Sequence, residues 1–286
     1  MGISFYEVSH SYPGLKKKET VDAIKNINLN INETGEFVCI VGQTGSGKST
    51  LVQHMNALLL PTMGYVDILG AKITPKAKKN PKLKPIRKNV GFVFQFPEYQ
   101  LFEETVLKDI VFAPKIFGMT ATEADSRAKE VANMLGISDL LDKSPFNLSG
   151  GQMRKVAIAG ILAYNPSILL LDEPTRGLDP KGQREIMDMF YELHTTTNKT
   201  TIVITHDMNI VYRYATRVIV MKDKEIFFDG TLNEVFGSDI YKESHLLKPQ
   251  ILSLIDYLNE KMGYNLKYEY KTEDELIKAL GGIINE

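Results

Sequence analysis

Apolar and polar residues alternate in two stretches near the N-terminus, residues 3–8 and 23–31. A period of two is typical of strands with one buried face, so we expect these stretches to form antiparallel strands. Four later stretches are almost continuously apolar: residues 37–41, 89–94, 168–171 and 201–205. Such runs are typical of strands that are buried on both faces, as in a parallel sheet. Residues 217–221 and 225–228 predict a closing hairpin.

A spacing of three and four residues predicts the helices. One helix is expected to open at a capping pattern in residues 122–125 and to end at Gly136. Its apolar face consists of Ala124, Ala128, Val131, Ala132 and Leu135. Another helix begins after Asp179 and turns Ile186, Phe190 and Leu193 inward.

The character of the chain changes after Gly230. A helix face is predicted there by Ile251, Leu254, Ile255, Leu258 and Met262. Alternation at Leu266, Tyr268 and Tyr270 predicts a strand, and residues 272–275 are expected to cap a last helix that ends at Gly281 and Gly282. About forty-five residues hold little core of their own, so this appendage should pack on the main domain or on another chain.

A basic segment extends from Lys72 to Lys88. It holds eight Lys or Arg residues and no acid, and it is interrupted by Pro75, Pro81 and Pro85. Because these prolines prevent a continuous amphipathic helix, we favour a solvated loop over a surface that contacts lipid headgroups.

Composition limits the class of protein. The 286 residues, 43% hydrophobic and 24% charged, suffice for one large domain with an appendage. A net charge of −1 argues against non-specific nucleic-acid binding, which requires a basic surface. The single cysteine, Cys39, excludes an intrachain disulfide and suits a reducing cytoplasm. We expect neither a signal peptide nor a membrane span, so any membrane role should depend on a partner.

Residues 42–49, with the sequence GQTGSGKS, fit the phosphate-binding pattern G-x-x-x-x-G-K-[ST] at every fixed position. They lie between a predicted strand and a predicted helix, which is the context that the pattern requires. The glycines allow backbone N–H groups to gather at the helix N-terminus, where the helix dipole favours an anion. The pattern predicts that Lys48 reaches the β- and γ-phosphates and that Ser49 holds Mg²⁺. A glycine-rich turn before an ordinary helix is the alternative.

Polar side chains follow three of the predicted buried strands. Asp172 and Glu173 point to opposite sides of their strand end, so one can bind Mg²⁺ while the other faces a water. His206 follows the next strand and could touch a γ-phosphate. Gln95 could meet Mg²⁺ or the attacking water, or it could simply cap a turn.

Residues 148–152, with the sequence LSGGQ, begin a helix in which Ser149 and Gln152 form a capping box. Two consecutive glycines in a first turn cost about 1 kcal/mol each relative to alanine, which favours a further role, the approach of an anion to bare N–H groups. Asp179 either caps its helix or has a signalling role. Tyr12 could stack on a nucleotide base or be an ordinary surface residue.

These motifs, in their order along the chain, resemble the ATP-binding subunits of ABC transporters over residues 3 to about 235. Within that family, three features are similar to the ATPase subunits of energy-coupling-factor (ECF) importers for vitamins and metal ions: residues 94–102, residues 156–163 and the C-terminal appendage. The resemblance implies an α/β fold, a P-loop NTPase of ABC type with a mixed sheet core, an antiparallel β subdomain, an α-helical subdomain and a small α/β C-terminal appendage. The expected domains are residues 1–235, with the helical subdomain at about 97–165, and an appendage at 236–286 that serves dimerisation.

The resemblance also implies roles for individual residues. The catalytic residues would be Glu173, which polarises the attacking water, His206, which contacts the γ-phosphate, and Gln95. The metal ligands would be Ser49, Gln95 and Asp172. Tyr12 would stack on adenine, and the remaining ATP-binding residues would be Gly42, Gln43, Thr44, Gly45, Ser46, Gly47, Lys48, Ser49 and Thr50.

A second set of residues would close over the ATP of a partner chain: Ser149, Gly150, Gly151, Gln152 and Asp179. A working site would therefore need two chains, head to tail. The family's usual Ser-Ala-Leu-Asp after the carboxylates is replaced by Arg176-Gly177-Leu178-Asp179, which leaves the communication between the two sites open.

The resemblance implies an ATP hydrolase that uses ATP and Mg²⁺ to drive transport from the cytoplasmic face of the membrane. Its partners would be a second ATPase subunit, either a copy or a paralogue, and integral membrane subunits that meet the surface near residues 96–102. An ATPase of another ABC transporter class and a soluble ABC ATPase are alternatives, although no heptads and no second phosphate loop lie between Lys48 and Asp172. A catalytically inactive nucleotide-binding scaffold is a third, against which Glu173 and His206 argue.

Overall fold

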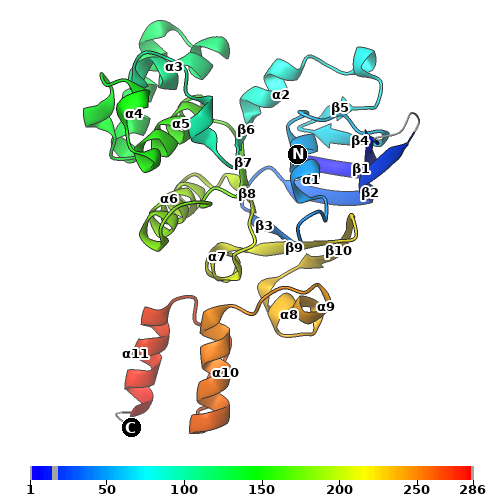
Figure 1. The fold of residues 1–286 in the computed structure, drawn as a ribbon, viewed down its shortest axis with the longest axis vertical. Helices are drawn as coiled ribbons and strands as arrows, with labels where there is room; N and C mark the ends of the chain where they lie inside the picture. The colour runs from blue at the N-terminus through cyan, green and yellow to red at the C-terminus, as the bar shows by residue number, and fades with distance from the viewer. Residues whose placement is uncertain (1, 15–18, 285–286) are drawn as a thin grey trace.

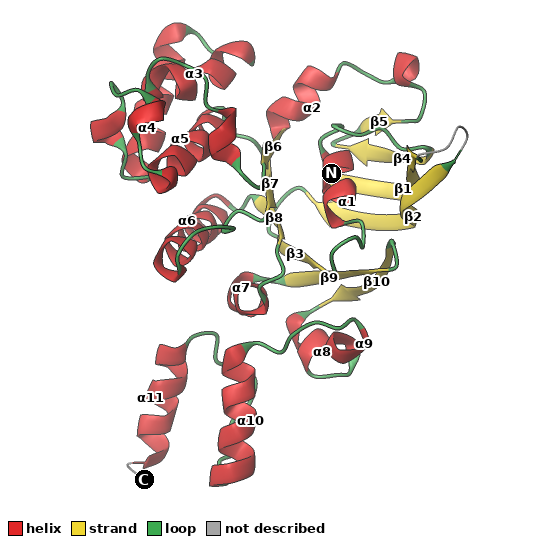
Figure 2. Cartoon of the chain, viewed as in Figure 1, coloured by secondary structure: helices red, strands yellow, loops and turns green. Residues whose placement is uncertain are grey.

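Two sheets organise the protein, for which a computed structural model describes residues 2–14 and 19–284. A six-stranded mixed sheet has the order β10-β9-β3-β8-β7-β6, and a four-stranded antiparallel sheet has the order β2-β1-β4-β5 (Figures 1 and 2). The strands are β1 (Gly2–Pro13), β2 (Thr20–Asn32), β3 (Phe37–Val41), β4 (Met63–Ile68), β5 (Ala71–Ile73), β6 (Val90–Val93), β7 (Ile168–Asp172), β8 (Thr200–Ile204), β9 (Arg217–Lys222) and β10 (Glu225–Gly230). The antiparallel pair, the buried strands and the closing hairpin predicted from the sequence are confirmed.

Some helices pack against the sheets, others gather in a group to one side of the strands, and a further group forms the C-terminal end (Figure 2). The helices are α1 (Lys48–Met55), α2 (Leu83–Asn89), α3 (Val106–Ile116), α4 (Ala121–Met134), α5 (Gly150–Ala163), α6 (Pro180–Thr197), α7 (Met208–Tyr214), α8 (Leu232–Phe236), α9 (Ile240–Glu243), α10 (Gln250–Met262) and α11 (Glu273–Ile284). Short 3₁₀ turns include η1 (Ala77–Lys79) and η2 (Pro97–Gln100). No helix in the described part of the chain is long and apolar enough to span a membrane.

Parallel pairing brings the ends of the central strands together. Val93 of β6 lies opposite Leu171 of β7, and Asp172 of β7 lies opposite Ile204 of β8. Ile204 in turn lies opposite Ile40 of β3, just before the phosphate loop. The chain segments that leave these strands therefore emerge at one edge of the sheet, where ligands bind in open α/β sheets.

Both faces of the central sheet are covered. Along β3, Phe37, Cys39 and Val41 belong to one apolar core, whereas Val38 and Ile40 belong to a second core against the antiparallel sheet. Cys39 is fully buried, and burial raises the pKa of its thiol to about 12, so the side chain packs as a neutral thiol. This two-sided burial explains the continuous apolar run in the sequence.

The cap of α4 lies two residues before the predicted position. Thr120, and not Thr122, is the N-cap: its Oγ1 accepts from Glu123 N at 3.3 Å, and Glu123 Oε2 accepts from Thr120 N at 2.8 Å. Both Thr120 and Thr122 stand close to an acid, but only Thr120 has the extended backbone that a cap needs. The predicted capping box of Ser149 and Gln152 on α5 is confirmed.

The basic segment differs from the predicted loop because α2 occupies its C-terminal half. Pro85 lies in the first turn of α2, where the missing backbone N–H breaks no helical hydrogen bond. The prolines therefore shorten the helix but do not abolish it.

The C-terminal appendage contains helices but no strand among residues 231–284, so the strand predicted at residues 266–270 is wrong. Leu266 instead pairs its backbone with a side chain of α10: its N–H donates to Asn259 Oδ1 at 2.8 Å, and its carbonyl accepts from Asn259 Nδ2 at 2.9 Å. The predicted helix end at Gly281 is also wrong, because α11 continues to Ile284. A glycine weakens a helix by only about 1 kcal/mol and stops it only where a left-handed cap forms.

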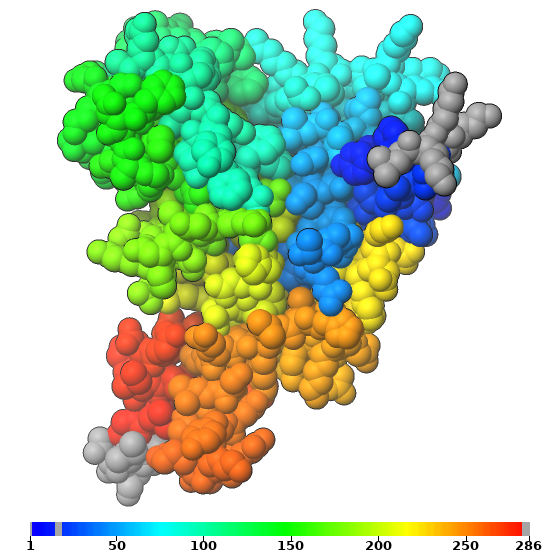
Figure 3. Space-filling model, in the orientation of Figure 1, coloured from blue at the N-terminus to red at the C-terminus, as the bar shows by residue number. Residues whose placement is uncertain are grey.

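The appendage packs on the main body through α10. Leu252 and Ile255 are fully buried there and share a core with Tyr212 of α7. Residues from about 240 onward form the lower end of the molecule in Figure 3. The division into residues 1–235 and 236–286 stays a prediction.

Candidate functional site

The phosphate loop joins β3 to α1, as the sequence predicts. Gly42 has a φ of 141° and Gly47 a φ of 100°, a region that side-chain-bearing residues rarely adopt. A Cβ at Gly42 would lie 2.1 Å from the carbonyl oxygen of Met221, and one at Gly47 would lie 2.4 Å from that of Ala23. Both glycines are therefore required by the close approach of neighbouring backbone.

Lys48 is the first residue of α1, and its side chain folds back over the loop. Its Nζ donates to the carbonyl oxygens of Gly42 at 2.7 Å and Gln43 at 2.9 Å. Burial lowers the pKa of this amine, while the nearby Glu173 and Asp172 carboxylates oppose that shift. The ammonium group thus lies within the loop, where it can exchange carbonyl partners for phosphate oxygens.

Ser49 and Asp172 meet between α1 and the end of β7. Ser49 Oγ donates to Asp172 Oδ1 at 3.5 Å, and Asp172 is buried. Burial raises the pKa of this carboxyl; the Ser49 hydroxyl and Lys48 partly oppose that shift. A buried carboxylate beside a hydroxyl is the kind of oxygen donor set that suits Mg²⁺, which would hold the carboxylate in its charged form.

Glu173 and His206 come from neighbouring strand ends. Their side chains are bonded, with His206 Nδ1 to Glu173 Oε1 at 2.9 Å. Glu173 has a φ of 50°, an unusual backbone conformation that its N–H stabilises by donating to Ile204 O at 3.0 Å. The Glu173 side chain is 13% exposed and that of His206 is 73% exposed, so the pair spans from the interior to the surface. Strained backbone at a carboxylate is typical of functional sites.

A cavity of about 560 Å³ lies beside the phosphate loop and the Glu173–His206 pair, whereas Ser49 and Asp172 do not line it. Gly42, Gln43, Thr44, Lys48, Glu173 and His206 line it, which brings most of the predicted catalytic edge together. Ten further residues that line it had not been predicted as site residues: Thr175, Arg176, Gly177, Gln183, Thr205, Asp207, Met208, His245, Leu246 and Leu247. Asp207 could have been suspected from its position next to His206. His245 to Leu247 come from the C-terminal appendage, and no local sequence signal points to them.

Gln95 and Tyr12 do not line the cavity. Gln95 leaves β6 at the same sheet edge and is partly exposed. Tyr12 is 40% exposed on β1, and its hydroxyl lies 3.4 Å from Thr50 Oγ1 in the first turn of α1. This position beside the phosphate-loop helix is compatible with a base-stacking role.

The predicted residues for the partner's ATP lie on a different surface. Ser149, Gly151, Gln152 and Asp179 line a separate cavity of about 430 Å³. Within the described part of the chain, no atom beyond the adjacent residues and the helix's own backbone lies within 4 Å of the place a Cβ would take at Gly150 or Gly151, so the N-terminus of α5 is open. Within one chain the structure therefore keeps this surface apart from the phosphate loop.

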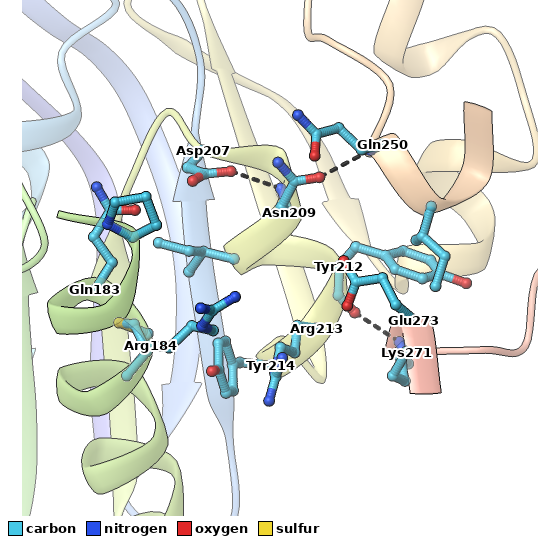
Figure 4. A pocket seen from close by; sticks show the side chains of 14 residues that line it. Gln183, Arg184, Asp207, Asn209, Tyr212, Arg213, Tyr214, Gln250, Lys271 and Glu273 are labelled. Atoms are coloured by element: carbon cyan, nitrogen blue, oxygen red, sulfur yellow. Dashed lines mark hydrogen bonds between the residues drawn. The ribbon is translucent and has the colours of Figure 1, made fainter. Parts of the chain in front are cut away.

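A third cavity, of about 210 Å³, separates α6 and α7 from the appendage (Figure 4). Two hydrogen bonds connect the sides: Gln250 N donates to Asn209 Oδ1 at 2.8 Å, and Lys271 Nζ donates to Tyr212 O at 3.0 Å. Asn209 N also donates to Asp207 Oδ1 at 2.8 Å. The appendage is thus connected to the residue that follows His206.

A strand, phosphate loop and helix, a carboxylate pair at a strand end and a capped glycine-rich helix are the parts of an ATP-binding cassette. The sequence model of the ABC transporter family matches residues 24–176. The protein titled "Dimeric structure of a post-hydrolysis state of the ATP-binding cassette MJ0796 bound to ADP and Pi" superposes with a TM-score of 0.71 at 37% identity, over 80% of this chain and 98% of that one.

More similar relatives are energy-coupling factor transporter ATP-binding proteins EcfA2. The protein from Ligilactobacillus salivarius is 50% identical over 92% of this chain and 93% of its own length, and that from Bacillus licheniformis is 46% identical over 100% and 99%. CbiO1 from Clostridium perfringens, described as part of the ABC transporter complex CbiONQ, has a TM-score of 0.72 at 35% identity, over 89% of this chain and 98% of its own. The chain belongs to the ABC transporter family, among its energy-coupling factor ATP-binding proteins.

Proposed function

We propose that the chain binds Mg–ATP and hydrolyses it in a composite site with a second ATPase subunit, and that this cycle drives an ECF-type importer of vitamins or other micronutrients. The observation that carries the proposal is the single cavity in which Lys48, Glu173 and His206 meet beside the phosphate loop. Charge neutralisation and a positioned carboxylate are the two requirements of phosphoryl transfer to water.

Glu173 is the proposed general base. Its carboxylate is held by His206 Nδ1 at 2.9 Å, which fixes its orientation toward the cavity. There it would orient a water and accept its proton as the water attacks the γ-phosphorus. His206, which is largely exposed, would contact the γ-phosphate once ATP is bound, and Gln95 would approach from the neighbouring strand end.

Mg²⁺ would lie between α1 and the end of β7. Ser49 and Asp172 supply a hydroxyl and a carboxylate oxygen, with Gln95 as the third proposed ligand. Among the described residues no cluster of three or more His, Cys, Asp or Glu could hold a metal ion. In ATPases Mg²⁺ is commonly held by one or two carboxylates together with substrate phosphates, so the phosphates of ATP would supply its remaining ligands. When bound, Mg²⁺ neutralises charge that develops on the phosphate oxygens.

A second ATPase subunit would complete the site. Ser149, Gly150, Gly151, Gln152 and Asp179 lie away from the phosphate loop of their own chain. In a head-to-tail pair, the open N-terminus of α5 would approach the γ-phosphate that the partner holds, where the helix dipole favours an anion. The partner would be a copy of the chain or a paralogue.

The membrane partner would contact the docking segment, residues 96–102. Phe96, Tyr99 and Phe102 are exposed there; Tyr99 is 84% exposed. Exposed aromatic residues are typical anchors of protein interfaces. The chain would thus work as a peripheral subunit on the cytoplasmic face of the membrane, together with integral coupling and substrate-binding subunits.

Two variants of the paired ATPase test the proposal. Glu173→Gln removes the base but keeps the side-chain size, so hydrolysis should fall by roughly 10²–10⁴ while ATP still binds. Because hydrolysis reopens the pair, this variant should elute as a closed dimer with Mg–ATP in size-exclusion chromatography. Lys48→Ala should weaken nucleotide binding itself and should not form that dimer.

The contrast between the variants separates chemistry from binding. Both should melt close to the parent temperature, since neither side chain supports the core. Parent-like hydrolysis by Glu173→Gln would exclude Glu173 as the base, and parent-like turnover by Lys48→Ala would exclude the phosphate-loop site.

A further inference from the structure

Arg154 and Glu98 form the least exposed ion pair among the described residues. Arg154 lies on α5 and is 3% exposed, and Glu98 lies on η2 in the docking segment. The guanidinium is bidentate: Nε donates to Glu98 Oε2 at 3.1 Å, and Nη2 donates to Glu98 Oε1 at 2.9 Å. This fork geometry holds the two groups in one plane and fixes their relative orientation.

The third nitrogen of Arg154 reaches a different segment. Nη1 donates to the carbonyl oxygens of Arg176 at 2.7 Å and Pro174 at 3.3 Å. These carbonyls belong to residues 174–178, the loop that follows the carboxylate of Glu173. Arg176 N in turn donates to Glu173 O at 3.1 Å. One guanidinium therefore binds both the docking segment and the loop that begins at the proposed base.

A second contact connects the same two segments. The guanidinium carbon of Arg176 lies 5.8 Å from the ring centroid of Phe96, close enough for a cation–π contact. Arg154 itself is five residues from Ser149, in the helix whose first turn is proposed to close over the partner's ATP. Arg154 thus connects the docking segment, the loop after Glu173 and helix α5.

A buried ion pair adds little net stability to a core, because both charges lose their hydration. An apolar pair of similar size would often be equally stable there. The ion pair instead fixes the relative orientation of the two segments that carry its charges. Such a fixed orientation lets a movement of one segment displace the other.

We propose that Arg154 is a positioning residue that transmits a displacement of the docking segment to the loop after Glu173 and to the first turn of α5. The inference rests on the proposed function, because it requires a membrane partner at residues 96–102. Movement of Glu98 turns the guanidinium plane, and the plane carries the Pro174 and Arg176 carbonyls with it. Nucleotide binding at the phosphate loop does not depend on this connection.

The test compares the detached ATPase pair with the complete transporter complex in lipid nanodiscs. Arg154→Lys keeps the charge but cannot hold the carboxylate and both carbonyls in one plane. We expect its ATP affinity and the hydrolysis rate of the detached pair to stay within about threefold of the parent. Hydrolysis in the complex, and its response to transported substrate, should fall at least tenfold. Lys129→Met, an exposed cation on α4, is the matched control and should leave all four readouts unchanged.

Glu98→Gln is the second variant and keeps its shape. Hydrolysis should fall in the complex but not in the detached pair, as for Arg154→Lys. The membrane subunits should still co-purify with the chain, because the Glu98 carboxylate faces Arg154 and not the partner. Equal activity of variant and parent complexes would overturn the inference. So would a parallel loss in the detached pair and the complex, or misfolding of both variants, since either would show a structural role only. Failure of the parent complex to hydrolyse ATP would instead overturn the proposed function.

Discussion

His54 shows how a single buried side chain sets a response to pH. It is fully buried on α1, and burial lowers the pKa of its imidazole to about 4. Its Nδ1–H donates to Thr50 O at 2.7 Å, while Nε2 has no hydrogen-bond partner within the described residues. The neutral form is therefore the folded form, and His10 packs against its ring with centroids 4.9 Å apart.

The first prediction follows from this pKa shift. Above pH 6.5, His54 is neutral in both the folded and the unfolded chain. Below pH 6.5, His54 is protonated in the unfolded chain but stays neutral in the folded chain until about pH 4. Between pH 6.5 and about pH 4, the free energy of unfolding should therefore decrease by about 1.4 kcal/mol for each unit by which the pH is lowered. Urea unfolding at pH 7.5 and pH 5 should show a smaller loss for His54→Met than for the parent. The exposed His245→Gln variant should keep the parent slope, and an unchanged slope in His54→Met would contradict the assignment.

Among the elements, η2 and the residues around it expose the aromatic surface proposed for docking. Phe102 also contacts Phe112 of α3 edge-on, with ring centroids 4.9 Å apart, so the surface continues onto the helical layer. Leu101 instead packs partly against the core, which makes it a poor choice for a surface substitution.

The second prediction replaces the exposed anchors. Tyr99→Glu combined with Phe102→Glu should release the chain from co-expressed membrane subunits, since a few buried aromatic anchors carry most of an interface's free energy. Nucleotide binding should stay at the parent level because neither residue lines the cavity beside the phosphate loop. Co-purification from membranes measures the effect, with Met134→Glu on α4 as an exposed apolar control. If the membrane subunits still co-purify with the double variant, the docking site does not lie at residues 96–102.

The molecule as a whole connects its C-terminal appendage to the cavity beside the phosphate loop. His245, Leu246 and Leu247 line that cavity, and α10 packs on α7, the helix after His206. On the outer side, apolar residues of α10 and α11 stay exposed: Leu254, Tyr257, Met262 and Ile277. An exposed apolar face of this kind is expected to meet a partner, here the second ATPase subunit.

The third prediction tests this role of the appendage. Deleting the residues after about 240 would uncover the core around Tyr212, so a substitution is sharper than a truncation. Leu254→Glu combined with Tyr257→Glu should preserve ATP binding but weaken association of the ATPase pair at least tenfold, because both changes bury a charge in the interface. Analytical ultracentrifugation measures the association. Val21→Glu, on the antiparallel sheet, should leave it unchanged, and undiminished association of the double variant would reject the role.

Short-range sequence patterns were sufficient to predict many elements of this protein. The buried strands, the phosphate loop and the Ser149–Gln152 cap were predicted correctly because they depend on interactions within a few residues. The family was also recognisable, because its short motifs stand in the expected order along the chain: the phosphate loop, Gln95, residues 148–152, Asp172 with Glu173, and His206. Where two local signals competed, as at Thr120 and Thr122, position along the sequence was not enough to choose between them.

Tertiary structure alone decided which distant groups meet. Arg154 and Glu98 are 56 positions apart, and neither stands in a pattern that predicts the other. His245, in the loop between α9 and α10, lines the cavity beside the phosphate loop although it is nearly two hundred positions from that loop. Leu266 lies in a loop, where its backbone N–H and carbonyl bond to the Asn259 side chain and not to a neighbouring strand. The physical reason is common to all three: hydrogen-bond partners and burial depend on distances in space, whereas periodicity records only distances along the chain.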